Sequence, residues 1–167
     1  MKLIAAVCAT VMMTACSHFT PNNKPIINQI SPTSKNDTSA MTAKTITIKS
    51  AYNFDTTTAK LSQAITSKGM TIFATIDHQK AAADVNLSMQ PATVIVFGTP
   101  KAGTPLMIKD PNFALQLPLK VLITEVNGDV LVSFNDTKAL INGSDISFDD
   151  VKNTLAAAEN LIKTTVQ

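Results

Sequence analysis

The chain has 167 residues, 14 lysines, no arginine and a formal charge of +2 at neutral pH. Its lysines do not cluster, so it lacks the basic patch that nucleic-acid binding needs. Without arginine it also lacks bidentate guanidinium clamps for phosphate or carboxylate. This length suits one domain with a short extension, and we expect no nucleic-acid partner.

The first residues predict a signal peptide. Lys2 precedes an apolar run that ends at Met13, and small residues follow it. This order is typical of secretory signal peptides, and the run is shorter than the roughly 20 residues that span a bilayer. We therefore expect residues 1–15 to be removed from the mature protein.

The next motif predicts a lipid anchor. Met13-Thr14-Ala15-Cys16 resembles the lipobox of bacterial lipoproteins, which implies cleavage before Cys16 and acylation of its sulfur and new amino group. Two or more acyl chains anchor a protein stably to a membrane. Ser17 is similar to an outer-membrane address, so we expect a periplasmic domain on the outer membrane, or on the cell membrane where no outer membrane exists. The alternative is an ordinary secreted protein that is cut elsewhere.

The cysteine and histidine content limits the chemistry of the mature domain. Cys8 would be discarded and Cys16 acylated, so no thiol remains for a disulfide, a nucleophile or a metal site. His18 would lie beside the lipid, and His78 is the only other histidine. We therefore expect no metal ion and no cofactor.

A tether separates the anchor from the folded domain. In residues 17–43, 15 of 27 positions are Ser, Thr, Asn or Pro. We interpret residues 16–43 as the lipidated cysteine with a flexible tether, which would span on the order of 30 Å as a random coil. The domain then covers residues 44–167.

The first half of the domain predicts a strand, a helix, a strand and a short helix. Residues 45–49 alternate apolar and polar side chains, as a half-buried strand does. Asp55 can cap a helix that Gly69 ends. A second strand places alternate apolar residues at Met70, Ile72, Ala74 and Ile76. An alanine-rich run over 79–85 predicts the short helix.

The second half predicts three strands and two helices. Residues 92–97 form an apolar run that is typical of a central strand, and Thr104-Pro105 predicts a helix start. Asn127-Gly128 joins residues 119–126 to residues 129–134, which is a strong hairpin signal. Apolar residues then follow a helical spacing at Phe148, Val151, Leu155, Ala158, Ile162 and Val166. This order predicts an α+β domain, with an antiparallel sheet of about five strands and two main helices on one face.

The last of these helices begins with acidic residues. Ser147 and Asp150 have the spacing of a capping box. Asp149 and Asp150 would lie in the first turn, where the helix dipole favours negative charge. We therefore interpret this carboxylate pair as structural.

Three stretches, residues 72–78, 97–107 and 117–120, resemble the family known as domain of unknown function 302 (DUF302). The resemblance covers most of residues 45–165. It implies a fold similar to that of the TATA-box-binding protein, in the order β-α-β(4)-α, and a homodimer. The family has no settled activity, so the resemblance implies no reaction.

The chain departs from the family pattern at several polar positions. Thr99 stands where the family usually has Asn, and Gln116 stands where it has Asp. Thr124-Glu125-Val126 replaces a Trp-Glu-Asp-like run, and Phe134 replaces Tyr. A family function that relied on those polar groups would be absent here.

The loop over residues 98–104 is a candidate ligand site. Its glycines have the spacing of a P-loop, but Thr104 and Pro105 stand where that motif needs Lys and then Ser or Thr. This departure excludes the binding of a nucleoside triphosphate in the manner of a P-loop. A helix N-terminus with Lys101 could still hold a small anion. The candidate ligand-binding residues are Gly98, Thr99, Lys101, Gly103 and Thr104. The alternative is that both glycines serve only the geometry of the loop.

Asp77-His78 is a candidate catalytic pair, in which Asp77 would orient His78 as a general base. The alternative is that Asp77 caps the short helix. A separate apolar stretch could line a ligand groove, form a dimer surface or belong to the core, and its residues are Met107, Phe113, Leu115 and Leu117.

The residue types favour binding over catalysis. The first hypothesis is a non-enzymatic, membrane-tethered periplasmic domain that binds a small anionic or apolar ligand, or a partner protein. The second is an enzyme that uses His78 and Lys101 near the 98–104 loop, which requires both in one pocket. The third is a structural envelope protein that acts as a dimer.

Overall fold

The computed structural model describes residues 45–167. The expectations for the signal peptide at 1–15, for Cys16 and for the rest of the tether to residue 43 lie outside the described residues. Within residues 45–167 no helix is both long and apolar enough to cross a membrane.

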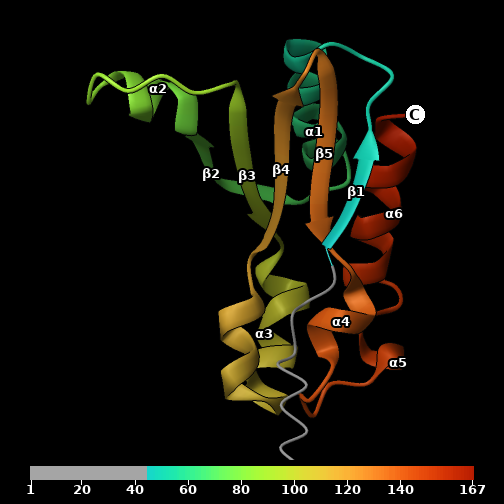
Figure 1. Ribbon diagram of the computed structural model, residues 1–167. Helices are drawn as coiled ribbons and strands as arrows, with labels where there is room; N and C mark the ends of the chain where they lie inside the picture. Colours follow the sequence, from blue (N-terminus) through green and yellow to red (C-terminus); the bar gives the residue numbers. More distant parts are fainter. Residues whose placement is uncertain (1–44) are drawn as a thin grey trace, which may run out of the picture. The chain divides into compact units, whose positions relative to one another are not determined.

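One antiparallel sheet of five strands organises the domain (Figure 1). The strands are β1 (Thr45–Lys49), β2 (Thr71–Asp77), β3 (Ala92–Gly98), β4 (Leu119–Val126) and β5 (Asp129–Asn135), and their order in the sheet is β1-β5-β4-β3-β2. Asn127 and Gly128 join β4 to β5 with φ angles of 55° and 83°. Positive φ at both central residues is what a tight hairpin needs, so the predicted hairpin is confirmed. β4 is the central strand, and β3 lies beside it.

Two long helices cover one face of the sheet (Figure 1). They are α1 (Phe54–Ser67) and α6 (Leu155–Thr165). The main hydrophobic core lies between these helices and the sheet, and consists of Leu61, Ile65, Ile95, Phe97, Val121, Ile123, Val130, Val132, Phe134, Ala158, Ile162 and Val166. The predicted α+β class, with its two main helices on one face, is confirmed.

Short helices gather at one end of the sheet (Figure 1). They are α3 (Pro100–Lys109), the 3₁₀ helix η1 (Pro111–Gln116), α4 (Thr137–Ile141) and α5 (Phe148–Val151). A second hydrophobic cluster holds this end together, and consists of Leu106, Phe113, Ile146, Val151 and Leu155. Neither η1 nor α4 was predicted from the sequence, because both are too short to show a clear periodicity.

Two predicted helix starts are wrong. Asn53 caps α1, since its Oδ1 accepts the Thr56 N–H at 2.9 Å, so Asp55 lies inside the first turn. The helix predicted from Thr104-Pro105 begins five residues earlier, with Pro100 as its first residue. Thr99-Pro100 is a start signal of the same kind, and it directly follows β3.

The predicted C-terminal helix is two helices. α5 ends at Val151, and α6 begins at Leu155 after a short turn. Val151 and Leu155 pack in the same hydrophobic cluster across this turn, whereas Phe148, predicted on the same apolar face, is exposed. The capping box is confirmed, because Asp150 Oδ2 accepts the Ser147 N–H at 2.8 Å and the Ser147 hydroxyl at 2.7 Å.

Helix α6 is also tied to α4 by a carboxylate. Glu159 Oε2 accepts the Thr137 N–H at 2.8 Å and the Thr137 hydroxyl at 2.7 Å. Burial raises the pKa of Glu159, but hydrogen bonds from Lys163 and Thr137 outweigh burial and hold the pKa below its usual value. The carboxylate therefore stays charged and anchors the start of α4.

A bulge in β2 changes which face its side chains occupy. Ile72 pairs with Phe97, but Ala74 already pairs with Val96, so Phe73 is an extra residue in the strand. Paired residues share a face of the sheet. Ile72 therefore faces the helices with Phe97, whereas Ala74 lies on the opposite face, and the predicted single apolar face of this strand is wrong.

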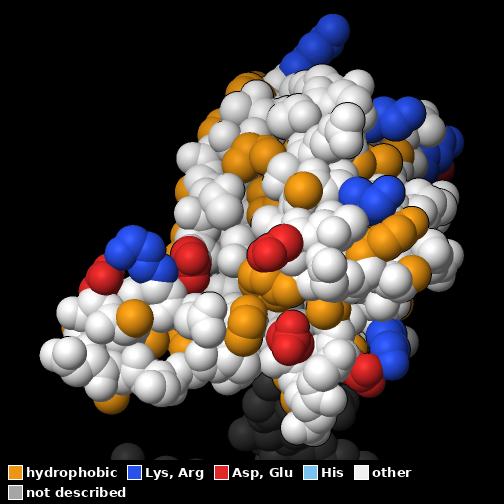
Figure 2. Space-filling model, turned by 90° about the horizontal axis from the view of Figure 1, so that it is seen from above, with side chains coloured by type: hydrophobic (Ala, Val, Ile, Leu, Met, Phe, Trp, Pro, Cys, Tyr) orange, Lys and Arg blue, Asp and Glu red, His pale blue; other side chains and the backbone are white. Residues whose placement is uncertain are grey.

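The bulge belongs to the least buried part of the described chain. β2 is an edge strand, and α2 (His78–Ala83) buries none of its residues. Figure 1 shows α2 projecting away from the rest of the domain, and Figure 2 shows hydrophobic side chains on this projection from above. The large exposed hydrophobic residues of this region are Phe73, Ile76, Val85 and Leu87.

Replacing the carboxylate of the capping box tests its contribution to stability. Hydrogen bonds from the Lys109 ammonium and from Ser147 hold the pKa of Asp150 well below its ordinary value of 3.8. A carboxylate with a pKa lowered on folding stabilises the fold above that ordinary value, and the stabilisation is lost as the pH falls further. We expect Asp150→Asn to lower the melting temperature at pH 7, with a difference that shrinks below about pH 4.

Asp149→Asn is the matched control, because the side chain of Asp149 is 84% exposed and, among the described residues, forms an ion pair only with Lys152. It should change the melting temperature little at any pH. Equal effects of the two substitutions in thermal unfolding monitored by circular dichroism would contradict this role of Asp150.

Candidate functional site

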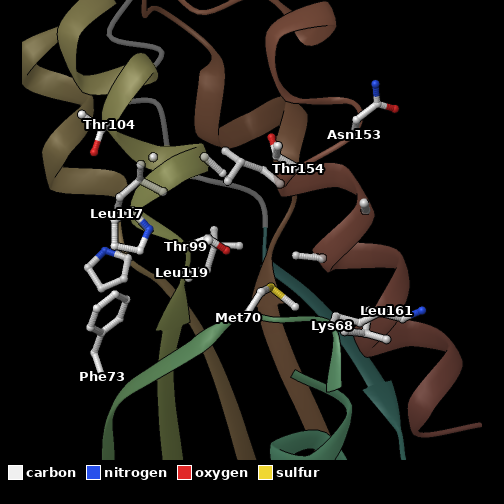
Figure 3. A pocket seen from close by; sticks show the side chains of 18 of the residues that line it. Lys68, Met70, Phe73, Thr99, Thr104, Leu117, Leu119, Asn153, Thr154 and Leu161 are labelled. Atoms are coloured by element: carbon white, nitrogen blue, oxygen red, sulfur yellow. The ribbon is translucent and has the colours of Figure 1, made fainter. Parts of the chain in front are cut away.

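A cavity of about 750 Å³ lies where α3 and α6 meet the end of the sheet (Figure 3). The junction of α1 with β2 and the end of β3 form part of its wall. The start of α3, residues 117–119 and one side of α6 complete it. The cavity therefore depends on segments that are far apart in the sequence.

The wall is mainly apolar. Its apolar members are Met70, Phe73, Pro100, Ala102, Met107, Leu117, Pro118, Leu119, Leu155, Ala157, Ala158 and Leu161. Its uncharged polar members are Thr99, Thr104, Asn153, Thr154, Asn160 and Thr164. Gly98 and Gly103 contribute backbone, and Lys68 is the one charged residue of the wall within the described chain. A mostly apolar wall with a few polar groups is typical of small-molecule sites.

Helix α6 forms one wall of the cavity. One face of this helix packs in the core, and the neighbouring face lines the cavity. Ala158 and Ile162 are buried in the core at 4% and 3% exposure. The next face along carries Ala157, Leu161 and Thr164, which line the cavity. Residues three and four apart share a helix face, so the cavity-lining residues form a continuous stripe beside the core stripe.

Helix α3 forms the facing wall, and its glycine, Gly103, lets it approach closely. A Cβ atom at Gly103 would lie 3.2 Å from Leu117 Cδ1, which is tighter than an ordinary contact. A Cβ atom at Gly98 would lie 3.7 Å from the Phe73 ring and 3.8 Å from Pro118 Cβ. Gly103 thus leaves space for the side chain of Leu117, whereas the contacts at Gly98 would be ordinary. Gly98 ends β3 and Gly103 lies inside α3, so neither lies in the loop that the sequence predicted.

The structure places four of the five candidate ligand-binding residues around one cavity. Gly98, Thr99, Gly103 and Thr104 line it, whereas Lys101 is exposed on α3 and does not. The N–H groups of Ala102 and Gly103 donate to the Thr99 carbonyl oxygen at 2.9 and 3.0 Å. These amides are therefore engaged within the helix, and the loop offers an apolar surface rather than an anion cradle.

The candidate catalytic residues do not meet in the described structure. His78 begins α2, and Asp77 Oδ1 accepts the Lys80 N–H at 2.8 Å, so Asp77 caps this helix. Asp77 pairs with Thr93 at one end of β3, and the cavity lies at the other end, by Gly98. Five residues of strand separate these ends by about 17 Å. Neither His78 nor Lys101 lines the cavity, so the geometry gives no support to a shared catalytic pocket.

The apolar stretch from Met107 to Leu117 begins inside α3 and divides between two of the expected roles. Met107 and Leu117 line the cavity. Phe113 is 2% exposed in the second hydrophobic cluster, and Leu115 is 81% exposed. Met107 and Leu117 thus fit the expected groove and Phe113 fits the expected core, whereas the dimer surface stays a prediction.

Sequence reasoning missed the wall that α6 and Lys68 provide. The stripe from Ala157 to Thr164 mixes small, polar and apolar residues, so it carries no clear pattern of its own. Lys68 directly precedes Gly69, where the predicted helix ends, so its local pattern indicates no ligand site. Only the packing of α1 and α6 on the same sheet face brings Lys68 and Leu161 to one cavity. Among residues 45–167 no three His, Cys, Asp or Glu side chains are grouped as a metal site.

Comparisons with solved structures support the fold. The chain is similar to the crystal structure of an uncharacterized conserved DUF302 protein from Bacillus stearothermophilus, with a TM-score of 0.62 and 13% sequence identity. The match covers 73% of this chain and 94% of that one. At this identity the similarity concerns the fold alone.

Comparisons with curated proteins give partial matches. The chain is 32% identical over 92 residues to the protein named fluoride-specific ion channel FluC 1 of Brucella suis, and the match covers 54% of this chain and 36% of that protein. The similarity to fluoride-specific ion channel FluC 2 of Brucella melitensis has the same identity and covers 34% of that protein. The chain thus spans about a third of the length of these relatives.

The family comparison covers most of the described domain. The sequence pattern of the family described as "Domain of unknown function DUF302" matches residues 46–163. This range runs from β1 to near the end of α6, so it includes every strand and both helices that cover the sheet. The chain therefore belongs to the DUF302 family.

Proposed function

We propose that this domain binds a small, mainly apolar ligand in the cavity between α3 and α6, and that Cys16 carries a lipid that holds the domain at a membrane. The cavity is the observation that carries the proposal. Its volume of about 750 Å³ lies within the range of roughly 300–1,000 Å³ that is usual for small-molecule sites.

Two features of the wall favour a ligand over a packing defect. The residues facing the space from α6 and α3 are small at Ala157, Ala102 and Gly103, so the space is kept open by side-chain choice along two helices. Thr99, Thr104 and Asn153 place isolated hydrogen-bonding groups around an apolar wall, which is how small-molecule sites orient their ligands. Catalysis has less support, because the candidate catalytic residues lie outside the wall.

The membrane part of the proposal rests on the N-terminal motif. Met13-Thr14-Ala15-Cys16 resembles a lipobox, and Ser17 favours the outer membrane over the cell membrane. The curated relatives are named as ion channels, and the similarity covers about a third of each. A module carried by membrane channels and by a lipid-anchored chain would work beside a lipid surface, where apolar molecules concentrate.

A second candidate role is homodimerisation through the edge strand β2. Within the described domain one side of β2 has no partner strand, and an open edge readily pairs with another strand. Phe73 is 51% exposed and Ile76 is 42% exposed on this strand. A two-fold axis beside β2 would bury the same patch on both copies, and this is the commonest arrangement of protein dimers.

Filling the cavity tests ligand binding. Ala157 is exposed on α6 and faces the cavity, so Ala157→Phe should occupy part of the space without disturbing the core. We expect the variant to bind an apolar fluorescent probe such as N-phenyl-1-naphthylamine about tenfold more weakly, as if two methylene groups of roughly 0.8 kcal/mol each were excluded.

Ala59→Phe is the matched control, because Ala59 is exposed on α1 and does not line the cavity. It should bind the probe like the unchanged chain, and both variants should keep their melting temperature. The proposed binding function would fail if both substitutions left probe affinity unchanged, or if the unchanged chain bound no probe.

Replacing the proposed lipidation site tests the anchor. We expect Cys16→Ser to prevent acylation and normal cleavage, because the hydroxyl does not replace the thiolate nucleophile in the acyl-transfer step. The variant should lose metabolic labelling by palmitate and change its migration on a gel. Normal processing and membrane retention of Cys16→Ser would contradict the lipoprotein assignment, whereas Cys8→Ser should behave like the unchanged chain.

A charge on the β2 edge tests the dimer. We expect the unchanged chain to have the mass of a dimer in size-exclusion chromatography with light scattering, and Ile76→Lys to have the mass of a monomer. Ile108→Lys is the control, because Ile108 is 77% exposed on α3, away from β2. A monomeric unchanged chain, or equal effects of both lysines, would rule out dimerisation at this edge.

A further inference from the structure

We propose that the ligand is a single-chain anionic amphiphile, with its charged head beside Lys68 and its acyl chain in the space between α3 and α6. This inference rests on the proposed binding function and specifies the chemical class of the ligand. It follows from the charge of the wall, from the place of Lys68 in it and from the volume of the cavity.

The charge of the cavity wall indicates the sign of the ligand's charge. Lys68 lines the cavity, and none of the described lining residues is Asp or Glu. Five of the ten lysines in residues 45–167 form ion pairs, namely Lys49–Asp129, Lys80–Asp84, Lys109–Asp150, Lys152–Asp149 and Lys163–Glu159. Lys68 is one of the other five, and of those five it is the one that lines the cavity. No described residue forms such a pair with Lys68. An unneutralised cation at an apolar cavity favours a ligand that brings a negative charge.

The position of Lys68 favours an amphiphilic ligand over a compact anion. Lys68 ends α1 and is exposed, so its ammonium lies at the rim of the cavity. Figure 3 shows Lys68 on the side of Leu161, with Phe73 and Leu117 on the opposite side. Asn160 precedes Leu161 on α6 and also lines the cavity, and its amide N–H groups can donate to an anionic head. A polar rim on one side and an apolar wall beyond it fit a molecule with one charged end.

The volume of the cavity indicates a ligand with one acyl chain. A methylene group fills roughly the 30 Å³ that one water molecule fills in the liquid. A chain of 12–16 carbons then needs roughly 360–480 Å³, whereas two such chains need roughly 720–960 Å³. The cavity of about 750 Å³ holds one chain of any of these lengths, and it is too small for two chains of 14 or more carbons.

Three twelve-carbon probes with different heads test the inference. Laurate, dodecan-1-ol and dodecyltrimethylammonium share one tail and differ only in charge. Each is titrated below its micelle-forming concentration against the full chain carrying Cys16→Ser, with bound N-phenyl-1-naphthylamine as the displaced reporter. At low salt we expect laurate to bind about three- to fivefold tighter than dodecan-1-ol, the effect of one exposed ion pair, and dodecyltrimethylammonium to bind weakest.

Substitutions at Lys68 then locate the head. Lys68→Met keeps an apolar stem and should make laurate and dodecan-1-ol bind alike, with dodecan-1-ol affinity unchanged. Lys68→Glu should reverse the order, so that dodecyltrimethylammonium binds tighter than laurate. Lys120→Met is the matched control, because Lys120 is exposed on β4 and does not line the cavity, and it should keep the preference for laurate.

Each contrary result has a distinct meaning. Equal affinities of laurate and dodecan-1-ol for the unchanged Lys68 chain would overturn the anionic head but leave an apolar site that Ala157→Phe still weakens. Loss of the preference in Lys101→Met would place the head at the 98–104 loop and overturn the role of Lys68. Displacement by dimyristoyl phosphatidylglycerol as strong as by laurate would overturn the single chain. Absence of any probe binding would overturn the proposed function together with this inference.

Discussion

The packing of α6 on the sheet is the interaction on which the rest of the described structure depends. Ala158, Ile162 and Val166 join the main core, and Leu155 joins the second cluster at the end of the sheet. One helix thus links both hydrophobic clusters. The Ala51 N–H donates to the Val166 carbonyl oxygen at 2.8 Å, which ties the end of α6 to the segment after β1. Burial of this face defines where the neighbouring face of α6 must lie.

The cavity follows from that placement. With one stripe of α6 in the core, the stripe from Ala157 to Thr164 faces α3 across a space that small side chains leave open. Larger residues there would bring the gain of roughly 25 cal/mol for each Å² of apolar surface removed from water. The fold forgoes that stabilisation at this position, while most of the core residues around Phe97 are completely buried. A space kept between well-packed regions is more easily understood as a binding site than as poor packing.

The structure shows the surroundings of several residues that depart from the family pattern. Thr99 lines the cavity, so its methyl and hydroxyl groups replace an amide and make the wall less polar. Phe134 is 4% exposed in the main core, where a ring without a hydroxyl needs no hydrogen-bond partner. Thr124 donates its hydroxyl to the Pro91 carbonyl oxygen at 3.0 Å and has a structural role. Thr99 therefore shapes the cavity wall, whereas Phe134 and Thr124 belong to the packing of the sheet.

The sequence by itself determined the order of the five strands and the two main helices, the α+β class, the hairpin at Asn127-Gly128 and the capping box at Ser147. These features depend on local periodicity and on the backbone preferences of a few neighbouring residues. It also showed the shortage of catalytic residue types, and it brought Gly98, Thr99, Gly103 and Thr104 forward as one candidate site. It could not choose between two Thr-Pro helix starts, and it could not reveal the bulge at Phe73.

Tertiary structure alone decided which residues share the cavity. Lys68, Leu117 and Leu161 lie on three separate segments, and each has an unremarkable local pattern. Their meeting depends on how two helices pack on one sheet face, which is a long-range property that no short window of sequence records. The same packing separates His78 and Lys101 from the wall, although the sequence had suggested them as a pair. The residue types therefore indicated which chemistries to expect, and the packing of α6 decided where the cavity lies.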